Sequence, residues 1–310
     1  MKRARMMMVV AACLAVAAGT VFAGSPAQAQ FPGENGLIAF QIDTGSGNQI
    51  FTVEADGNDL FQVTHLHDAS TPDWSPDGRW IAFSRNECSI ALIHPDGTDL
   101  QKIPSQTPGG CETDPAFTPN GRRLVFERFD PATNDDAIWI MHVDGSDRRR
   151  LGTGPLGGAA TPEVSPDGRT VSFLTGNKDD LTEIWAVSIR GGDSWQVTPA
   201  LWGMTFKHDW APDGSRIVVS DNAGNPDRPV NLLTIRPNGT GLLYLTDFQR
   251  PSRRALAGGY SPDGEWIVLR VEHGDQSALE LIHPDGTDLH AILPFSDFRP
   301  RFIDWGPTPS

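Results

Sequence analysis

Most features that mark common protein classes are absent from this sequence of 310 residues. After Phe22 no apolar run approaches the roughly 18 residues that a membrane-spanning helix needs, and no segment repeats apolar residues at helical spacing. The chain has no Gly-x-Ser-x-Gly motif, and no glycine-rich phosphate-binding motif stands between a strand and a helix. These absences argue against a helical fold, a phosphate-binding α/β domain and an α/β-type serine hydrolase.

Basic charge is also scarce, because 25 Lys and Arg residues face 39 Asp and Glu residues, for a formal net charge of -14. Three basic residues stand in MKRAR, ahead of the apolar segment from Met6 to Phe22 and of Ala27-Gln28-Ala29. This pattern predicts a secretory signal peptide over residues 1–29, with a lipidated Cys13 or an uncleaved anchor as alternatives. Removing it would bring the charge to -17. The signal peptide predicts a secreted or periplasmic protein. A surface this acidic repels nucleic acid, so we expect no nucleic-acid partner.

Repetition is the most abundant signal in the chain. An apolar run such as Ile81-Ala82-Phe83 returns six times, and its last residue falls at Phe40, Phe83, Phe126, Phe173, Val219 and Leu269. A tight-turn sequence of the Ser-Pro-Asp-Gly kind precedes five of the runs, and the shorter Glu34-Asn35-Gly36 precedes the first. A second turn, usually Asp-Gly, follows about half a period later. Each unit therefore predicts four short strands joined by two tight turns and a loop.

The local chemistry of Pro, Asp and Gly explains why these residues recur in the turns. Proline fixes φ for the second turn position, Asp bonds nearby backbone amides, and Gly supplies the positive φ that follows. The apolar runs do not alternate with polar residues, which is typical of strands covered on both faces. Four short strands per unit, six times over, predict an all-β fold, a six-bladed β-propeller. Asp77 is then a structural turn residue, because repeated copies, with Asn120 in one of them, do not suit a single catalytic site.

The first unit lacks an innermost strand, and the chain offers a replacement at its other end. The segment 298–305 reads FRPRFIDW and places Trp305 in the position that Trp74 holds in the second unit. We therefore expect the C-terminal strand to complete the first blade and close the ring, which removes open sheet edges. The propeller is predicted over residues 30–310, with blades at approximately 31–65 plus 298–305, 68–106, 109–154, 157–200, 202–248 and 255–296.

Units of the form TPDWSPDGRWIAFSR…IALIHPDGTDLQKI resemble the WD-like repeats of TolB-type six-bladed propellers. The resemblance covers essentially all of the chain from Phe31 to Trp305. TolB-type proteins carry an additional α/β domain before the propeller, whereas here the expected signal peptide leads directly into the first blade. The resemblance therefore implies a partner-binding propeller, whereas the absence of the extra domain argues against the envelope role of TolB itself.

One position before the anchor residue of each innermost strand is expected to face the central channel. Four of the six residues at this position are acidic, namely Asp73, Glu163, Asp209 and Asp304. Together with His208 they are the candidate binding residues. The four carboxylates are also candidate ligands for a divalent cation such as Ca²⁺, which prefers several oxygen ligands. The alternative is that they bond neighbouring backbone or face water. No catalytic residue and no other cofactor is predicted.

Two of the three cysteines lie in segments that the predicted topology brings to one face. Cys88 falls between the second and third strands of blade 2, and Cys111 falls in the connection to blade 3. Both segments lie opposite the Pro-Asp-Gly turns, on what we call the loop face. A disulfide is predicted for a secreted chain, with two separate buried thiols as the alternative.

The sequence favours a secreted, non-catalytic propeller that acts as a monomer. It would bind a protein or glycan, in the cell envelope or outside the cell, through the loop face and the channel mouth. Trp202, Phe206 and Phe295, near the variable loops, are candidate contacts or blade-packing residues. The alternative is a carbohydrate- or peptide-active enzyme that works at an acidic, metal-binding channel.

Overall fold

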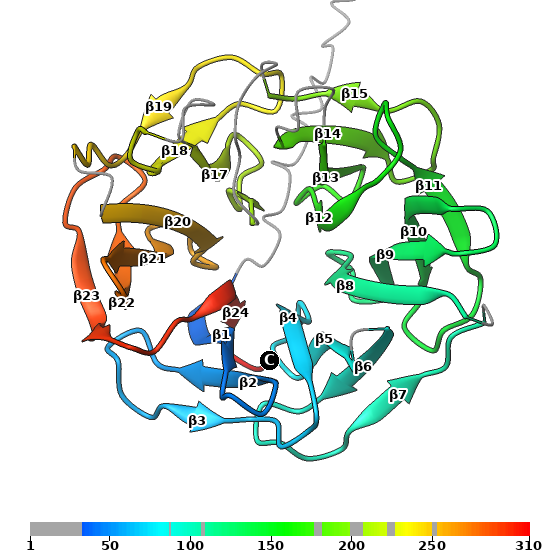
Figure 1. The fold of residues 1–310 in the computed structure, drawn as a ribbon, viewed down its shortest axis with the longest axis horizontal. Helices are drawn as coiled ribbons and strands as arrows, with labels where there is room; N and C mark the ends of the chain where they lie inside the picture. The colour runs from blue at the N-terminus through cyan, green and yellow to red at the C-terminus, as the bar shows by residue number, and fades with distance from the viewer. Residues whose placement is uncertain are drawn as a thin grey trace, which may run out of the picture.

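The structure, a computed structural model, describes residues 33–86, 88–106, 109–176, 182–198, 207–221, 227–249 and 253–310. Within these ranges the chain forms six four-stranded antiparallel sheets arranged as blades around a central channel (Figure 1). The predicted all-β six-bladed propeller is confirmed. The predicted signal peptide lies outside the described residues. No helix in the described ranges is long and apolar enough to cross a membrane.

Blade 1 is built from both ends of the described chain, and its strand order is β24-β1-β2-β3. The strands are β24 (Arg301–Pro307), β1 (Asn35–Asp43), β2 (Asn48–Val53) and β3 (Phe61–Gln62). In the antiparallel β1–β24 pair, Asn35 is the register partner of Pro307 and Ile38 that of Trp305. The last strand therefore closes the ring, as the sequence predicts.

The other five blades follow the chain from the channel outward. Blade 2 has β4 (Ala69–Trp74), β5 (Ile81–Arg85), β6 (Ser89–Ile93) and β7 (Gln101–Ile103). Blade 3 has β8 (Cys111–Phe117), β9 (Arg123–Asp130), β10 (Asp135–His142) and β11 (Arg149–Gly152). Blade 4 has β12 (Ala160–Val164), β13 (Thr170–Gly176), β14 (Thr182–Ser188) and β15 (Trp195–Gln196).

The last two blades have the same plan. Blade 5 has β16 (Asp209–Trp210), β17 (Ile217–Asp221), β18 (Asn231–Ile235) and β19 (Leu243–Tyr244). Blade 6 has β20 (Arg253–Tyr260), β21 (Ile267–His273), β22 (Gln276–Ile282) and β23 (His290–Ser296). Both tight turns of every blade lie on one side of the ring, the turn face, because the inner strand runs from the loop face towards the turn.

The hydrophobic core lies between the blades. Ile81, Ala82 and Phe83 of β5 are all fully buried, as expected for a strand covered on both faces. Phe83 packs in a cluster that joins Ala39 of blade 1 to Trp74 of blade 2, and similar clusters occupy the other blade interfaces. The ring is therefore held together by side chains that each blade shares with its neighbours.

Candidate binding site at the central channel

The carboxylates of three inner strands bond the backbone of the next blade. Asp304 of blade 1 accepts the amide of Trp74 in blade 2 at 2.8 Å, and Asp73 of blade 2 accepts that of Phe117 in blade 3 at 2.7 Å. Asp209 of blade 5 accepts the amide of Tyr260 in blade 6, also at 2.7 Å. These acids therefore connect adjacent blades along the channel wall, which gives each of them a structural task.

Blade 4 uses a different connection. Its channel residue Glu163 forms an ion pair with Lys207, which stands two residues before Asp209 in blade 5. The side chains of Lys207 and Glu163 are 9% and 5% exposed, so the pair is almost fully withdrawn from water. Blades 3 and 6 place Ala116 and Gly259 at the channel position and make no such bond.

Lys207 supplies the positive charge at the centre of the four carboxylates. Burial alone would lower the pKa of its ammonium, but Glu163, Asp304, Asp209 and Asp73 together hold that pKa above its usual value. We call these four acids and Lys207 the channel cluster. The structure thus brings together four of the five residues that the sequence offers as binding candidates, around a lysine that the sequence reasoning did not single out.

Burial raises the pKa of every acid in the channel cluster. For Asp73 and Asp209 the increase is large, and the nearby carboxylates add to the effect of burial. The pKa of Glu163 rises to about 7, because desolvation outweighs the attraction of an ammonium that it shares with three other acids. Burial likewise raises the pKa of Asp304, although Lys207 opposes the change. Glu163 is therefore partly protonated near neutral pH.

Two small cavities lie among the described residues of the channel. One, of about 20 Å³, lies towards the loop face between Thr71, Asp114, Thr161, Lys207 and Phe302. The other, of about 10 Å³, lies towards the turn face beside Asp209, Tyr260 and Asp304. Each is about the size that one water molecule requires.

The channel cluster does not fit a Ca²⁺ site. Lys207 already occupies the space between the carboxylates and pairs with Glu163, and Asp73, Asp209 and Asp304 each direct one oxygen to a backbone amide. In the described ranges no three His, Cys, Asp or Glu side chains are grouped as ligands of a metal ion would be. Ca²⁺ binding in the channel stays a prediction of the sequence, and it would require the ammonium of Lys207 to move away.

His208 lies apart from the channel cluster. Its Nε2 is 2.8 Å from Oγ of Ser172 in β13, and the ring is fully buried at the junction of blades 4 and 5. Desolvation, aided by the neighbouring Lys207, lowers its pKa to about 3. Ser172 also accepts the indole N–H of Trp210 at 2.8 Å. His208 is therefore a neutral side chain that joins two blades.

Four inner strands contain a bulge two residues before the channel position. Thr71, Asp114, Thr161 and Phe302 occupy it with φ between 45° and 51°. Positive φ is unusual for residues other than glycine, above all for β-branched threonine, so the surroundings must hold it in place. The amide of Thr71 is satisfied by Oε1 of Gln41 at 2.7 Å, and that of Asp114 by Oγ of Ser84 at 2.8 Å. This second layer of bonds between blades was not expected from the sequence.

Asp114 also forms a carboxyl pair that sequence reasoning missed. Its side chain hydrogen-bonds that of Glu127 in β9, and burial together with the charges of Asp114 and Asp136 raises the pKa of Glu127 to about 9. The pair adjoins the loop-face end of the channel, where Asp114 lines the cavity. A bulged residue and its cross-strand neighbour create it, so the sequence pattern alone carries little signal for it.

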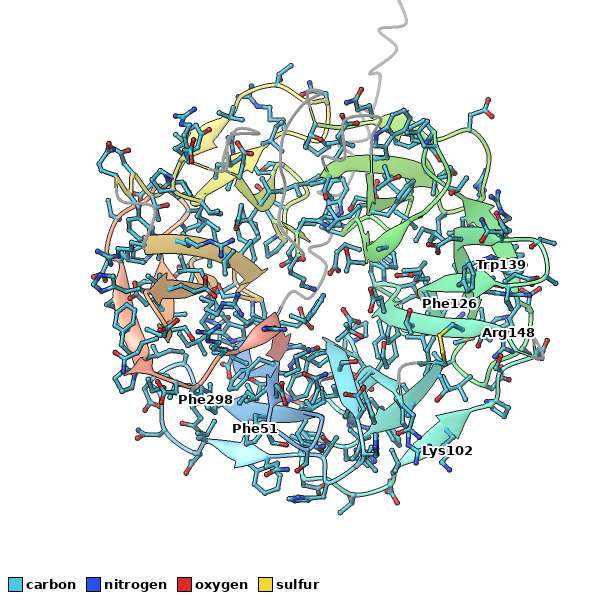
Figure 2. All side chains as sticks on the ribbon, in the orientation of Figure 1. Phe51, Lys102, Phe126, Trp139, Arg148 and Phe298 are labelled. Carbon is cyan, nitrogen blue, oxygen red and sulfur yellow. A yellow bond between two sulfur atoms is a disulfide. The ribbon has the colours of Figure 1, made fainter. Side chains whose placement is uncertain are left out.

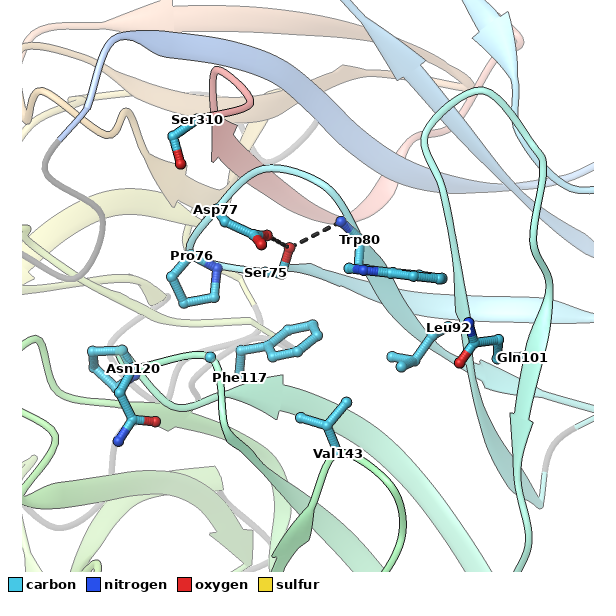
Figure 3. Close-up of a pocket in the computed structure, with 12 residues that line it drawn as sticks. Ser75, Pro76, Asp77, Trp80, Leu92, Gln101, Phe117, Asn120, Val143 and Ser310 are labelled. Carbon is cyan, nitrogen blue, oxygen red and sulfur yellow. Dashed lines mark hydrogen bonds between the residues drawn. The ribbon is translucent and has the colours of Figure 1, made fainter.

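The turn aspartates act within their own turns. Oδ1 of Asp77 accepts the hydroxyl of Ser75 at 2.6 Å and the amide of Arg79 at 3.1 Å, and Ser75 in turn accepts the amide of Trp80 (Figure 3). The same bonds recur at Asp167 and Asp263. A groove of about 480 Å³ lies between the turns of blades 2 and 3, beside Pro76, Trp80 and Phe117.

On the loop face, Cys88 and Cys111 form a disulfide between blades 2 and 3 (Figure 2). Of the aromatic residues expected near the loops, Phe295 is 38% exposed. Trp202 and Phe206 lie outside the described residues. The loop face therefore presents a disulfide-braced connection and at least one accessible aromatic ring.

A protein-family model described as PD40, the TolB beta propeller domain, matches residues 71–309. The "Uncharacterized peptidase YuxL" of Bacillus subtilis is 25% identical over 191 residues, which cover 51% of this chain and 29% of that protein. The "Protein TolB homolog" of Chlorobium chlorochromatii is 27% identical over 143 residues, covering 44% of this chain and 31% of that protein. The chain thus spans less than a third of the length of either relative.

Among solved structures, TolB from Acinetobacter baumannii superimposes with a TM-score of 0.70. The identity is 19%, and the match covers 88% of this chain and 67% of that one. At this level of identity the likeness concerns the fold alone. The family model and the superposition agree on a TolB-type β-propeller.

Proposed function

Because this chain belongs to the TolB β-propeller domain family, we propose that it is an exported, non-catalytic propeller that binds a protein or glycan partner. Binding takes place on the loop face and at the channel mouth. One observation carries the proposal. Among the described residues, the side chains of the channel cluster are engaged in bonds between neighbouring blades, and the cavities beside them measure only about 20 and 10 Å³, which favours binding of a ligand at the rim.

The rigidity of the ring supports this role. Three carboxylate–amide bonds and the Lys207–Glu163 pair connect successive blades, and the Cys88–Cys111 disulfide braces the loop face itself. A rigid surface loses little conformational entropy on binding, so more of the contact energy appears as affinity. The predicted signal peptide would deliver this surface to the periplasm or the cell exterior.

An affinity pull-down from the source's cell envelope tests the proposal, with the full exported chain as bait. The matched variants are Phe295→Glu on the loop face and Phe61→Glu on the outer rim, whose rings are 38% and 45% exposed. We expect a captured partner to bind the purified chain directly, to lose at least about tenfold in affinity with Phe295→Glu, and to keep its affinity with Phe61→Glu. A partner that tolerates every loop-face change would contradict the proposal.

An enzyme is the second candidate, and two observations favour it. A relative over 51% of the chain bears the name of a peptidase, and the Asp114–Glu127 pair keeps a proton near the channel mouth. A carboxyl group with a raised pKa can act as a general acid. Turnover of a peptide or glycan panel that disappears in Glu127→Gln, in a protein that still melts at the wild-type temperature, would establish this alternative.

A further inference from the structure

Arginine side chains gather on one sector of the loop face, where blade 6 meets blade 1. Arg254 stands at the start of β20, Arg270 in β21, and Arg299 and Arg301 flank the start of β24. These strands are neighbours around the ring, since β24 contacts both β20 and β21 (Figure 1). In a chain with a net charge of -14, such a basic sector is an exception that calls for a physical explanation.

Arg270 anchors this sector from below. Its side chain is only 12% exposed, and it donates a hydrogen bond of 3.0 Å to the carbonyl oxygen of Pro300. Pro300 separates Arg299 from Arg301, so Arg270 fixes the backbone that presents both of them to solvent. The backbone that carries Arg299 and Arg301 is therefore fixed before a ligand binds.

Carboxylates neutralise the sector only in part. Glu272 pairs with Arg270 at 3.0 Å and with Arg254 at 3.3 Å, and Asp275 pairs with Arg299 at 3.7 Å. Arg301 is exposed and makes no ion pair or side-chain hydrogen bond with the described residues. Desolvation, together with the like charges of Arg301, Arg254 and Arg299, lowers the pKa of Arg270 to about 10. The four arginines thus outnumber the two carboxylates that pair with them.

We propose that these four residues, the arginine patch, bind an acidic segment of a protein partner through its Asp and Glu side chains. The inference rests on the proposed function and names the chemistry of the partner. Guanidinium groups match carboxylates in planar, two-pronged geometry. Glu272 receives one contact from each of two arginines, so the patch already accommodates a carboxylate.

The surroundings favour a short acidic segment over a long polyanion. Nucleic acid would extend beyond the patch onto the acidic remainder of the surface and be repelled there. Phe295, 38% exposed and in edge contact with His273, offers an apolar surface beside the arginines for a peptide side chain. Arg301 also leads directly into Phe302, which lines the loop-face cavity, so the patch borders the channel mouth.

The test measures binding of a fluorescein-labelled oligoglutamate peptide to the full exported chain by fluorescence anisotropy. The test variant is Arg299→Glu with Arg301→Glu, two exposed residues outside the core. The control is Arg122→Glu with Arg169→Glu, two exposed residues on the turn face, which changes the net charge equally. We expect salt-sensitive binding by the wild type, at least about a tenfold loss in the test variant, and no loss in the control.

Three outcomes would overturn the proposal: no binding by the wild type, equal losses in both double variants, or tighter binding of a DNA oligonucleotide than of oligoglutamate. The pull-down separates this inference from the proposed function. A partner that the test variant captures in full overturns the patch and leaves the proposed function standing. Loss of oligoglutamate in the test variant, without any captured partner, supports the patch and counts against the proposed function.

Discussion

Asp304 accepts the backbone amide of Trp74 across 230 positions of sequence, at a distance of 2.8 Å. This bond connects the closing strand β24 to the inner strand of blade 2, so the carboxylate helps to hold the two ends of the ring in place. Asp73 and Asp209 make the equivalent bond to the blade that follows their own, at Phe117 and Tyr260. The main role of these three channel aspartates is therefore to accept hydrogen bonds from backbone amides, and substitutions can test this role.

Substituting Asp73 separates the role of an acceptor from that of a charge. Asp73→Asn keeps an oxygen for the amide of Phe117, and we expect it to fold with nearly wild-type stability. Asp73→Ala leaves that buried amide without its acceptor and should cost about 1 to 3 kcal/mol of unfolding free energy. Denaturant titrations of both variants measure the difference. Equal and large losses in both would show that the ionised carboxylate is required.

Removing the cation from the channel should be more damaging. Lys207→Met leaves four carboxyls without their ammonium, and we expect a loss of about 3 to 5 kcal/mol, as for other broken buried pairs. Adding Glu163→Gln to this variant removes one of the unpaired acids and should restore part of the stability. The double-mutant cycle, read from denaturant midpoints, gives the coupling. Addition of Ca²⁺ to Lys207→Met tests whether a metal can replace the ammonium, with a raised melting temperature as the positive sign.

Stability should depend on pH through Glu163 with a definite sign. Its pKa is about 7 in the folded protein against 4.5 in the unfolded chain, so the folded state holds a proton that the unfolded state releases. The resulting stabilisation is fully present below pH 4.5 and is lost as the pH rises to about 7. His208, with a pKa lowered to about 3, acts in the opposite direction at acid pH. The measurement is therefore the difference in unfolding free energy between wild type and Glu163→Gln, which should fall as the pH rises. A flat difference would contradict the burial argument.

The disulfide between Cys88 and Cys111 spans 23 residues of sequence. A crosslink over a loop of this length restricts the unfolded chain and should contribute about 3 kcal/mol. We expect a reductant to lower the denaturation midpoint of the wild type, and to leave that of Cys88→Ala with Cys111→Ala unchanged. Insensitivity of the wild type to the reductant would mean that the crosslink is absent in solution or adds no stability.

The repeat predicts the fold because each unit determines its own turns and strands from residues that are close together in the sequence. Each Ser-Pro-Asp-Gly turn specifies its own hairpin, and the FRPRFIDW segment supplies the strand that the first unit lacks. The channel acids are also identifiable, since Asp73 occupies a fixed position beside its anchor. Their bonds are not, because Phe117 stands 44 residues after Asp73 and the contact exists only once two blades are adjacent.

The rest of the candidate site depends on residues that depart from the repeat, and the sequence identifies only some of these residues. Lys207 is one of four lysines in the chain, and it replaces the residue that other inner strands place in the bulge. That irregularity could have drawn attention to it. The arginine patch comes from three separate segments, and only the closed ring brings them together. His208 could not be assigned to the blade junction without knowing which way its ring points.

Asn35 and Pro307 are register partners, so the two ends of the propeller domain lie side by side in blade 1. The position of the chain ends is then one of several positions that the closed ring would accept. A short linker between these neighbours would give a ring without a preferred starting blade, and new ends could be opened at another exposed connection. Such a circular permutant would contain six uninterrupted blades. Its stability would show whether folding requires the split blade, or whether other chain orders of the same six blades fold equally well.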